Sequence, residues 1–212
     1  MSLEHPILLK SFEYIDQRIG RHTLTPQAYA IARRVIHSTA DFEFLDLLRF
    51  DPPVAPGGST GVIDIAVQAL SQSTPIVVDV NMVRQGVQTL VNKTSQNPLY
   101  AAIDYGNPPQ AGKTCTESGI LHCIERFPQA IYVIGNAPTA LLALCEAIAD
   151  GRAAPAFVIG VPVGFVKVLE AKLALSLQPC PQIRVDGNKG GSSVAAAIVN
   201  ALLMLAKSIK VS

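Results

Sequence analysis

The sequence predicts an α/β fold, a three-layer α/β/α sandwich built on a five-stranded parallel sheet. Short segments rich in β-branched residues alternate along the chain with longer segments of helical spacing. The strand segments are almost continuously apolar, as in Ile131-Tyr132-Val133-Ile134. Both of their faces therefore need cover, which the crossover helices of a parallel sheet provide. Hydrophobic residues make up 49% of the 212 residues and charged residues 16%, which indicates a compact globular protein with an ample core.

Five predicted strands each end near a Gly, Asp or Asn. They span residues 75–81, 99–103, 131–135, 155–160 and 182–185. The predicted helices that follow them span residues 83–91, 116–126, 138–149, 165–175 and 191–206. Residues 105–113 contain two glycines and two prolines, so we expect an irregular loop beside the end of the second strand.

The first third of the chain is predicted to be mainly helical. Helical patterns cover residues 26–37, 42–48 and 60–70, with a turn-rich stretch at 51–59. We interpret residues 1 to about 72 as an extension of the same domain, and residues 73 to 212 as the doubly wound sheet. A single domain, residues 1–212, is expected because one α/β layer structure can occupy this length.

The bulk properties of the chain argue against several classes of partner. A formal net charge of +1 supplies no general attraction to nucleic acid or anionic lipid, so neither nucleic acid nor a membrane is expected. The longest apolar region, residues 194–206, is shorter than the roughly 20 residues that cross a bilayer, and no leader pattern is seen. The four cysteines lack a CxxC spacing, so we expect reduced thiols and a cytoplasmic protein.

The loops after the predicted strands form the expected ligand site. In open parallel sheets, ligands bind beyond the carboxyl ends of the strands, where the strand order reverses. Residues 79–83, 135–139, 160–164 and 187–193 lie at such ends and are rich in Gly, Pro and Asn. This pattern locates a site but names no reaction.

Five separated motifs are more specific than the fold pattern. They are RVIHSTADF at 34–42, VDVNMV at 78–83, VIGNAPTAL at 133–141, GVPVGFV at 160–166 and GNKGGS at 187–192. Together they resemble the precorrin-8X methylmutase family, including its cobalt-precorrin-8 counterparts. Their order and spacing fit the family from about Ser11 to the C-terminus.

This resemblance implies a flavodoxin-like sheet, a homodimer and a tetrapyrrole substrate. The implied reaction is a 1,5-migration of a methyl group from ring carbon 11 to ring carbon 12, which gives hydrogenobyrinate or cobyrinate. It needs no cofactor, because the conjugated ring carries the electrons and the protein only has to bind and polarise it. A well-placed proton donor, typically worth about 100- to 10,000-fold, is sufficient chemistry.

His37 is the candidate proton donor. It matches the motif histidine of the family, and histidine titrates closest to neutral pH. Without the resemblance, a lone histidine after the apolar pair Val35 and Ile36 is more often a packed or capping residue. The other three histidines match no motif, and with the cysteines and acidic residues they form no recognisable metal-ligand set, so no metal site is expected.

The remaining candidate site residues are expected to bind the substrate. In the turn at 136–139, backbone donors are expected to point outward at the start of a helix, a place that suits carboxylates, although helix capping alone would explain it. In the glycine-rich loop at 187–193, a ligand can approach the backbone closely, although a tight turn is the simpler interpretation. Asp79 could orient a partner or cap the next turn. The full set is Ser11, Asp79, Asn81, Met82, Asn136, Ala137, Thr139, Gly190, Gly191 and Ser192.

The sequence departs from the family at Cys115. The family usually carries an arginine at this position, expected to face the substrate, and Lys113 is a candidate replacement. A lysine cannot reproduce the bidentate carboxylate binding of an arginine. Cys115 is not expected to be a nucleophile, because no activating base is identifiable beside it.

Two other functions are consistent with parts of the pattern. A corrinoid-binding or carrier protein of the same fold, without catalysis, is suggested by Cys115. A flavin or nucleotide protein is suggested by the doubly wound pattern alone. The glycine-rich loop lacks the GxxxxGK[ST] spacing of a P-loop, which argues against ATP.

Overall fold

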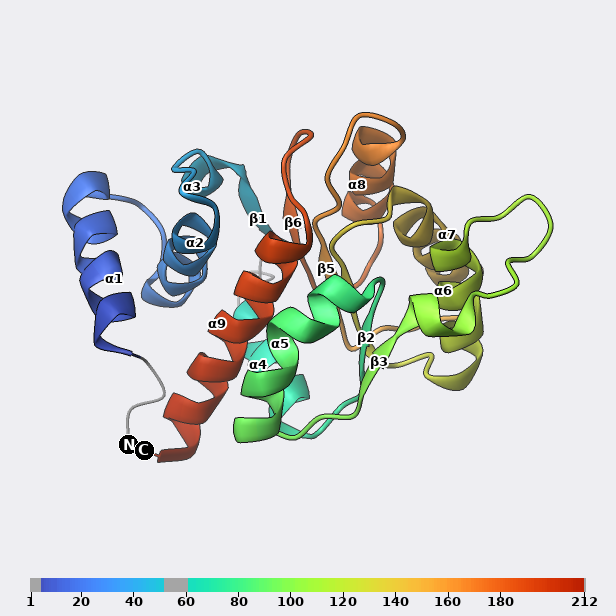
Figure 1. Ribbon diagram of the computed structural model, residues 1–212, viewed down its shortest axis with the longest axis horizontal. Helices are drawn as coiled ribbons and strands as arrows, with labels where there is room; N and C mark the ends of the chain where they lie inside the picture. The colour runs from blue at the N-terminus through green and yellow to red at the C-terminus, as the bar shows by residue number, and fades with distance from the viewer. Residues whose placement is uncertain (1–4, 52–60, 212) are drawn as a thin grey trace.

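The computed structural model describes residues 5–51 and 61–211. Its centre is a six-stranded sheet in the order β1-β6-β5-β4-β2-β3 (Figure 1). The five predicted parallel strands are confirmed, as β2 (Ile76–Val78), β3 (Leu99–Ala101), β4 (Ile131–Ile134), β5 (Phe157–Gly160) and β6 (Gln182–Val185). The predicted strand count was wrong by one, because β1 (Leu48–Asp51) adds an antiparallel edge strand.

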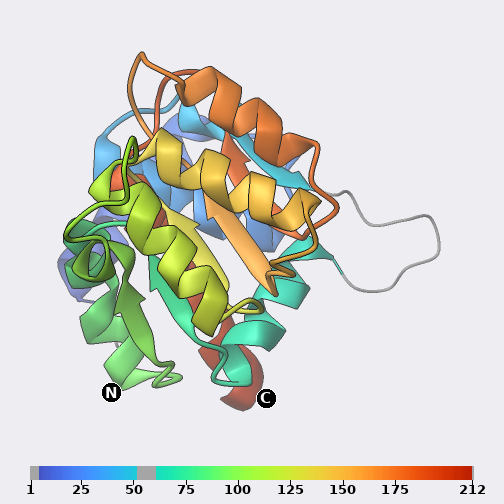
Figure 2. The same ribbon diagram turned by 90° about the vertical axis from the view of Figure 1, so that its right-hand side faces the viewer.

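Helices cover both faces of the sheet. Their bounds are α1 Pro6–Ile19, α2 Pro26–Thr39, α3 Phe44–Leu47, α4 Val62–Ser71, α5 Asn81–Lys93, α6 Cys115–Arg126, α7 Pro138–Ala149, α8 Val168–Ser176 and α9 Ser192–Val211, with a 3-10 turn at Ala102–Tyr105. Figure 2 shows α6, α7 and α8 side by side across one face. Helices α4, α5 and α9 cover the other face, and α2 packs on α9. The predicted three-layer sandwich is confirmed.

The strands are apolar on both faces because each face meets a helical layer. Val133 and Ile159 belong to the larger hydrophobic core, on the side of α9. Tyr132 and Val158, one residue earlier in each strand, belong to the second core, on the side of α6 and α7. All four side chains are fully buried, so the continuous apolar runs follow from the two-sided cover.

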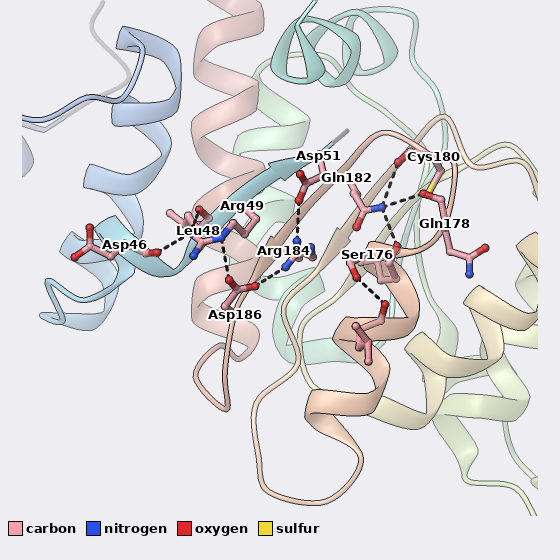
Figure 3. Close-up of polar contacts among 12 residues, drawn as sticks. Asp46, Leu48, Arg49, Asp51, Ser176, Gln178, Cys180, Gln182, Arg184 and Asp186 are labelled. Carbon is pink, nitrogen blue, oxygen red and sulfur yellow. Dashed lines mark hydrogen bonds and ion pairs between the residues drawn. The ribbon is translucent and has the colours of Figure 1, made fainter. Parts of the chain in front are cut away.

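The edge strand β1 was missed because its signal is not local. A helix was predicted over 42–48, but α3 ends at Leu47 and the chain then extends along β6. Two ion pairs link β1 to β6 and the residue that follows it: Arg49 pairs with Asp186 at 2.8 Å, and Arg184 with Asp51 at 3.0 Å (Figure 3). These partners lie more than 130 residues apart in the sequence, so only the folded sheet brings them together. Most of the predicted turn at 51–59 lies outside the described residues.

Helix α1 was also not predicted. Pro6 occupies its first position, and the His5 ring accepts a hydrogen bond from the N–H of Ile7 at 3.2 Å, an arrangement that satisfies a free donor at the helix start. Phe12 and Ile15 are buried against the rest of the protein. This helix places Ser11 beside α2, with which α1 packs.

The strand order locates the edge where a ligand is expected. From β2 the chain passes outward to β3 and then returns across β2 to β4. The five parallel strands therefore have the flavodoxin-like order 2-1-3-4-5, with the switch point between β2 and β4. Within the described residues, no helix is both long and apolar enough to cross a membrane.

Candidate functional site

His37 and Ser11 form a hydrogen-bonded pair. His37 lies in the last turn of α2 with an exposed side chain. The hydroxyl of Ser11 lies 2.8 Å from its Nδ1, and the ring of Phe12 meets the imidazole edge-on at a centroid distance of 5.7 Å. Nδ1 is thus occupied, and among the described residues Nε2 has no hydrogen-bond partner. Because the ring is exposed, His37 is not a packed core histidine.

Asp79 closes the turn between β4 and α7. Its fully buried carboxylate accepts hydrogen bonds from the backbone N–H groups of Gly135, Asn136 and Ala137 at 3.1, 2.7 and 2.8 Å. Burial raises the pKa of the Asp79 carboxyl, and these three donors oppose that shift. The expectation of free, outward-pointing donors is therefore wrong for Asn136 and Ala137, because an internal carboxylate already uses their N–H groups. Pro138 has no N–H, and within the described residues the N–H of Thr139 donates to no backbone carbonyl.

This carboxylate also bears on the nucleotide alternative. In doubly wound nucleotide proteins, phosphate binds to backbone donors at a helix start beside the switch point. Here Asp79 follows β2 and the three donors follow β4, the two strands that flank the switch point. A phosphate at the same place would compete with a buried negative charge, which argues against a flavin or nucleotide.

The side chains of the 136–139 turn differ in their exposure. Asn136 is exposed, whereas Ala137 is only 7% exposed. The hydroxyl of Thr139 lies 3.0 Å from that of Thr114. Because Thr114 is the residue before α6 and Thr139 lies in the first turn of α7, this contact places the starts of the two helices side by side.

Cys115 is therefore close to the predicted site. It is the first residue of α6 and is half-buried. Lys113, the candidate replacement for the family arginine, pairs with Glu117 at 2.8 Å. An ammonium already paired with a carboxylate of α6 is a poor replacement for a free cation. Cys115 is a free thiol, as are the three buried cysteines.

Asn81 and Met82 begin α5, at the end of β2. The Asn81 amide donates to Asp104 at 3.0 Å, and Arg84 pairs with the second oxygen of the same carboxylate at 2.6 Å. Met82 is 73% exposed. Sequence reasoning missed Arg84 and Asp104; the spacing from Asn81 to Arg84, one helical turn, was the available signal.

The glycine-rich loop between β6 and α9 packs tightly against the end of β5. Gly190 has a φ of 151°, and a Cβ on it would lie 2.3 Å from the carbonyl oxygen of Val161. The N–H of Gly191, with a φ of 114°, donates to that same oxygen at 2.8 Å. Ser192 is buried and starts α9. The tight-turn interpretation thus explains both glycines; close approach of a ligand is an additional proposal.

Lys189 links this loop to the His37 helix. Its ammonium contacts Asp41 at 2.6 Å and Glu43 at 2.8 Å, just after the end of α2. This pairing lowers the pKa of Asp41 and raises that of Lys189. The end of α2, the loop and the carboxyl ends of the parallel strands therefore share one edge of the molecule (Figure 1). No local signal marks Lys189, because its partners lie more than 140 residues away.

Among the described residues, no cluster of side chains that could hold a metal ion is found.

The chain is similar to known methylmutases over most of its length. Residues 6–205 match the CbiC family model, described as precorrin-8X methylmutase. A cobalt-precorrin-8 methylmutase from Synechocystis sp. is 62% identical over 210 residues, covering 96% of this chain and 97% of that protein. A precorrin-8X methylmutase from Pseudomonas aeruginosa is 35% identical over 202 residues, covering 92% and 93%. The crystal structure of precorrin-8x methyl mutase from Thermus thermophilus has a TM-score of 0.84 at 38% identity, covering 96% and 98%.

Proposed function

Because the chain belongs to the precorrin-8X methylmutase family, we propose that it moves a methyl group from ring carbon 11 to ring carbon 12 of its tetrapyrrole substrate. It acts as an isomerase of cobalamin synthesis, and the product is hydrogenobyrinate or cobyrinate. The 62% identical relative is named for cobalt-precorrin-8, which favours the cobalt-containing substrate. Reaction in the cytoplasm, without a cofactor, is part of the proposal.

The observation that carries this proposal is the pair of Ser11 and His37. The hydroxyl occupies Nδ1 at 2.8 Å, so it fixes the ring and directs Nε2 toward a ligand. A proton or hydrogen bond given from Nε2 to a ring nitrogen of the substrate draws electron density out of the conjugated system. Migration of the methyl group then becomes easier, in the way that general acids assist a reaction.

The loops around this pair bind the rest of the ring. Ser11, Asn81, Met82, Asn136, Ala137, Thr139, Gly190, Gly191 and Ser192 remain the proposed contacts. Asp79 is fully buried, so we now assign it the role of a positioning residue that shapes the 135–137 turn. Substrate carboxylates then meet the exposed side chain of Asn136 rather than the donors that Asp79 occupies.

A homodimer is part of the proposal. On the outward side of α8 and the loop before it, six large apolar side chains are 44% to 93% exposed: Val163, Phe165, Val166, Leu169, Leu173 and Leu177. Phe165, Leu169, Leu173 and Leu177 recur every four residues; Leu169 and Leu173 lie on α8, and Phe165 and Leu177 flank the helix. We call these six side chains the exposed stripe. Val163 lies close to Gly191, since a Cβ on Gly191 would lie 3.4 Å from its side chain. A second copy bound to this stripe would therefore also line the proposed substrate site.

The experiment that tests the function mixes the purified protein with precorrin-8X or cobalt-precorrin-8. Methyl migration changes the conjugation of the ring and leaves its mass unchanged, so a shifted absorbance spectrum with an unchanged mass supports the proposal. The alternative, a carrier without catalysis, is favoured by Cys115. It predicts tight binding with no conversion of the bound ring.

A further inference from the structure

Helix α8 contains a buried lysine. Its inward face carries Val168, Ala171, Lys172 and Leu175, the spacing of an apolar stripe. Lys172 is 4% exposed and is the one basic residue among the buried side chains of the described chain. A buried cation costs several kcal/mol of desolvation, and an apolar residue is often tolerated better at such a position. The lysine therefore needs an explanation beyond packing.

The partners of Lys172 lie in the glycine-rich loop. Its ammonium donates to the carbonyl oxygens of Gly187 and Lys189, both at 2.6 Å. Burial lowers the pKa of Lys172 to about 8, while Asp186 opposes the shift, so the side chain is still mostly protonated at neutral pH. One cation thus pulls two alternate carbonyl groups of the loop toward the protein interior.

The geometry of the peptide bond fixes what these carbonyls do to the next residues. In a trans peptide, the C=O of one residue and the N–H of the next point in opposite directions. With the carbonyls of Gly187 and Lys189 turned inward, the N–H groups of Asn188 and Gly190 point away from Lys172. Within the described residues, neither N–H group donates a hydrogen bond. They are two donors without an acceptor among the described residues, separated by one residue.

The rest of the loop is held in place around these donors. The side chain of Asn188 donates to the carbonyl oxygen of Gly164 at 2.6 Å, and the N–H of Gly164 donates back to the Asn188 carbonyl at 3.2 Å. The Lys189 side chain is fixed by Asp41 and Glu43. The donors are therefore pre-organised before a ligand arrives, which lowers the entropic cost of binding.

We propose that Lys172 is a positioning residue of the substrate site, which turns the N–H groups of Asn188 and Gly190 outward to receive a carboxylate of the tetrapyrrole. The inference rests on the proposed function for the choice of ligand. The N–H groups of Asn188 and Gly190 then bind the carboxylate in place of the N–H groups of the 135–137 turn, which already donate to Asp79. The positive charge of Lys172, behind two polarised peptide groups, strengthens both donors.

The test compares two ligands, cobyrinate and its fully methyl-esterified form, which keeps the ring and removes the negative charges. Lys172→Met retains the length of the side chain and loses the charge. We expect it to lose about tenfold or more in affinity for cobyrinate and less than about twofold for the ester, by calorimetry. Lys93→Met, an exposed lysine at the end of α5, is the matched control for total charge and should change neither affinity.

Two outcomes would overturn the proposal. Unchanged affinity for cobyrinate would show that Lys172 does not organise the site, and equal losses for both ligands would show a purely structural role. If Lys172→Met does not fold, the wild-type protein provides the test by NMR. The amide resonances of Asn188 and Gly190 should shift clearly more with cobyrinate than with the ester, and shifts of equal size with both ligands refute the proposal. Because this readout needs no turnover, failure of catalysis in the wild type would leave it interpretable.

Discussion

The Ser11 hydroxyl lies 2.8 Å from Nδ1 of His37, although 26 residues separate the two in the sequence. Two helices create this contact: α1 carries the serine and α2 carries the histidine in its last turn. A hydroxyl at Nδ1 fixes both the orientation of the ring and the nitrogen that remains for a ligand.

Ser11→Ala should therefore slow methyl migration while leaving the fold intact. Loss of one hydrogen bond, typically about 0.5–1.5 kcal/mol, predicts a roughly 3- to 10-fold decrease in kcat. Ser38→Ala is the matched control, because Ser38 lies next to His37 and, within the part of the chain that the structure describes, its hydroxyl bonds only the carbonyl of Val35. Equal turnover of the two variants, measured by absorbance, would mean that Ser11 does not orient the catalytic ring.

Asp79→Asn should destabilise the protein. The new amide group would present N–H donors to a turn where three backbone N–H groups need an acceptor. A buried donor left without a partner costs about 1–3 kcal/mol, so the midpoint of urea unfolding should fall. Asp104→Asn is the comparison, because Asp104 is partly exposed and such pairs contribute about 1 kcal/mol or less. Similar midpoints for both variants would contradict the role given to Asp79.

Cys115→Arg should restore a carboxylate contact. Because the Lys113 ammonium is paired with Glu117, Lys113 does not supply a free cation at this position. The new arginine should tighten cobyrinate binding by about 1–3 kcal/mol, and salt should weaken binding more steeply than in the wild type. Calorimetry at two salt concentrations measures both effects. Flat or weaker affinity would mean that position 115 does not face a substrate carboxylate.

Leu173→Lys should dissociate the proposed dimer. It places a charge in the middle of the exposed stripe on α8, where Leu173 is 63% exposed, and charges are depleted from the cores of interfaces. Ile7→Lys, at a residue 71% exposed on α1, is the control and should keep the wild-type mass. Light scattering after gel filtration gives the mass of each protein. A monomeric wild type, or a dimeric Leu173→Lys variant, would refute this interface.

Much of the fold could be predicted because its signals are local. Each parallel strand is a short apolar run followed by a turn residue, and the helices between them show helical spacing. The pairing of β1 with β6 and the capping of the 135–137 turn by Asp79 are not local. They join residues 56 or more positions apart, so no window of sequence contains both partners.

The candidate site was predicted in part for the same reason. Motif resemblance selected His37 and Ser11, and the structure shows that they touch. Lys172 was not selected, because in the sequence it is one position in an otherwise ordinary helical pattern. Only the folded chain brings its ammonium to the carbonyls of Gly187 and Lys189.

The role of His37 is tested most directly by comparing the wild type with His37→Ala in single-turnover reactions with cobalt-precorrin-8, followed by absorbance. Cobyrinate binding by calorimetry serves as the control for an intact site. We expect conversion by the wild type and a loss of about 100-fold or more in the variant, the range for a general acid, with cobyrinate affinity nearly unchanged. Turnover of His37→Ala within about threefold of the wild type would contradict it.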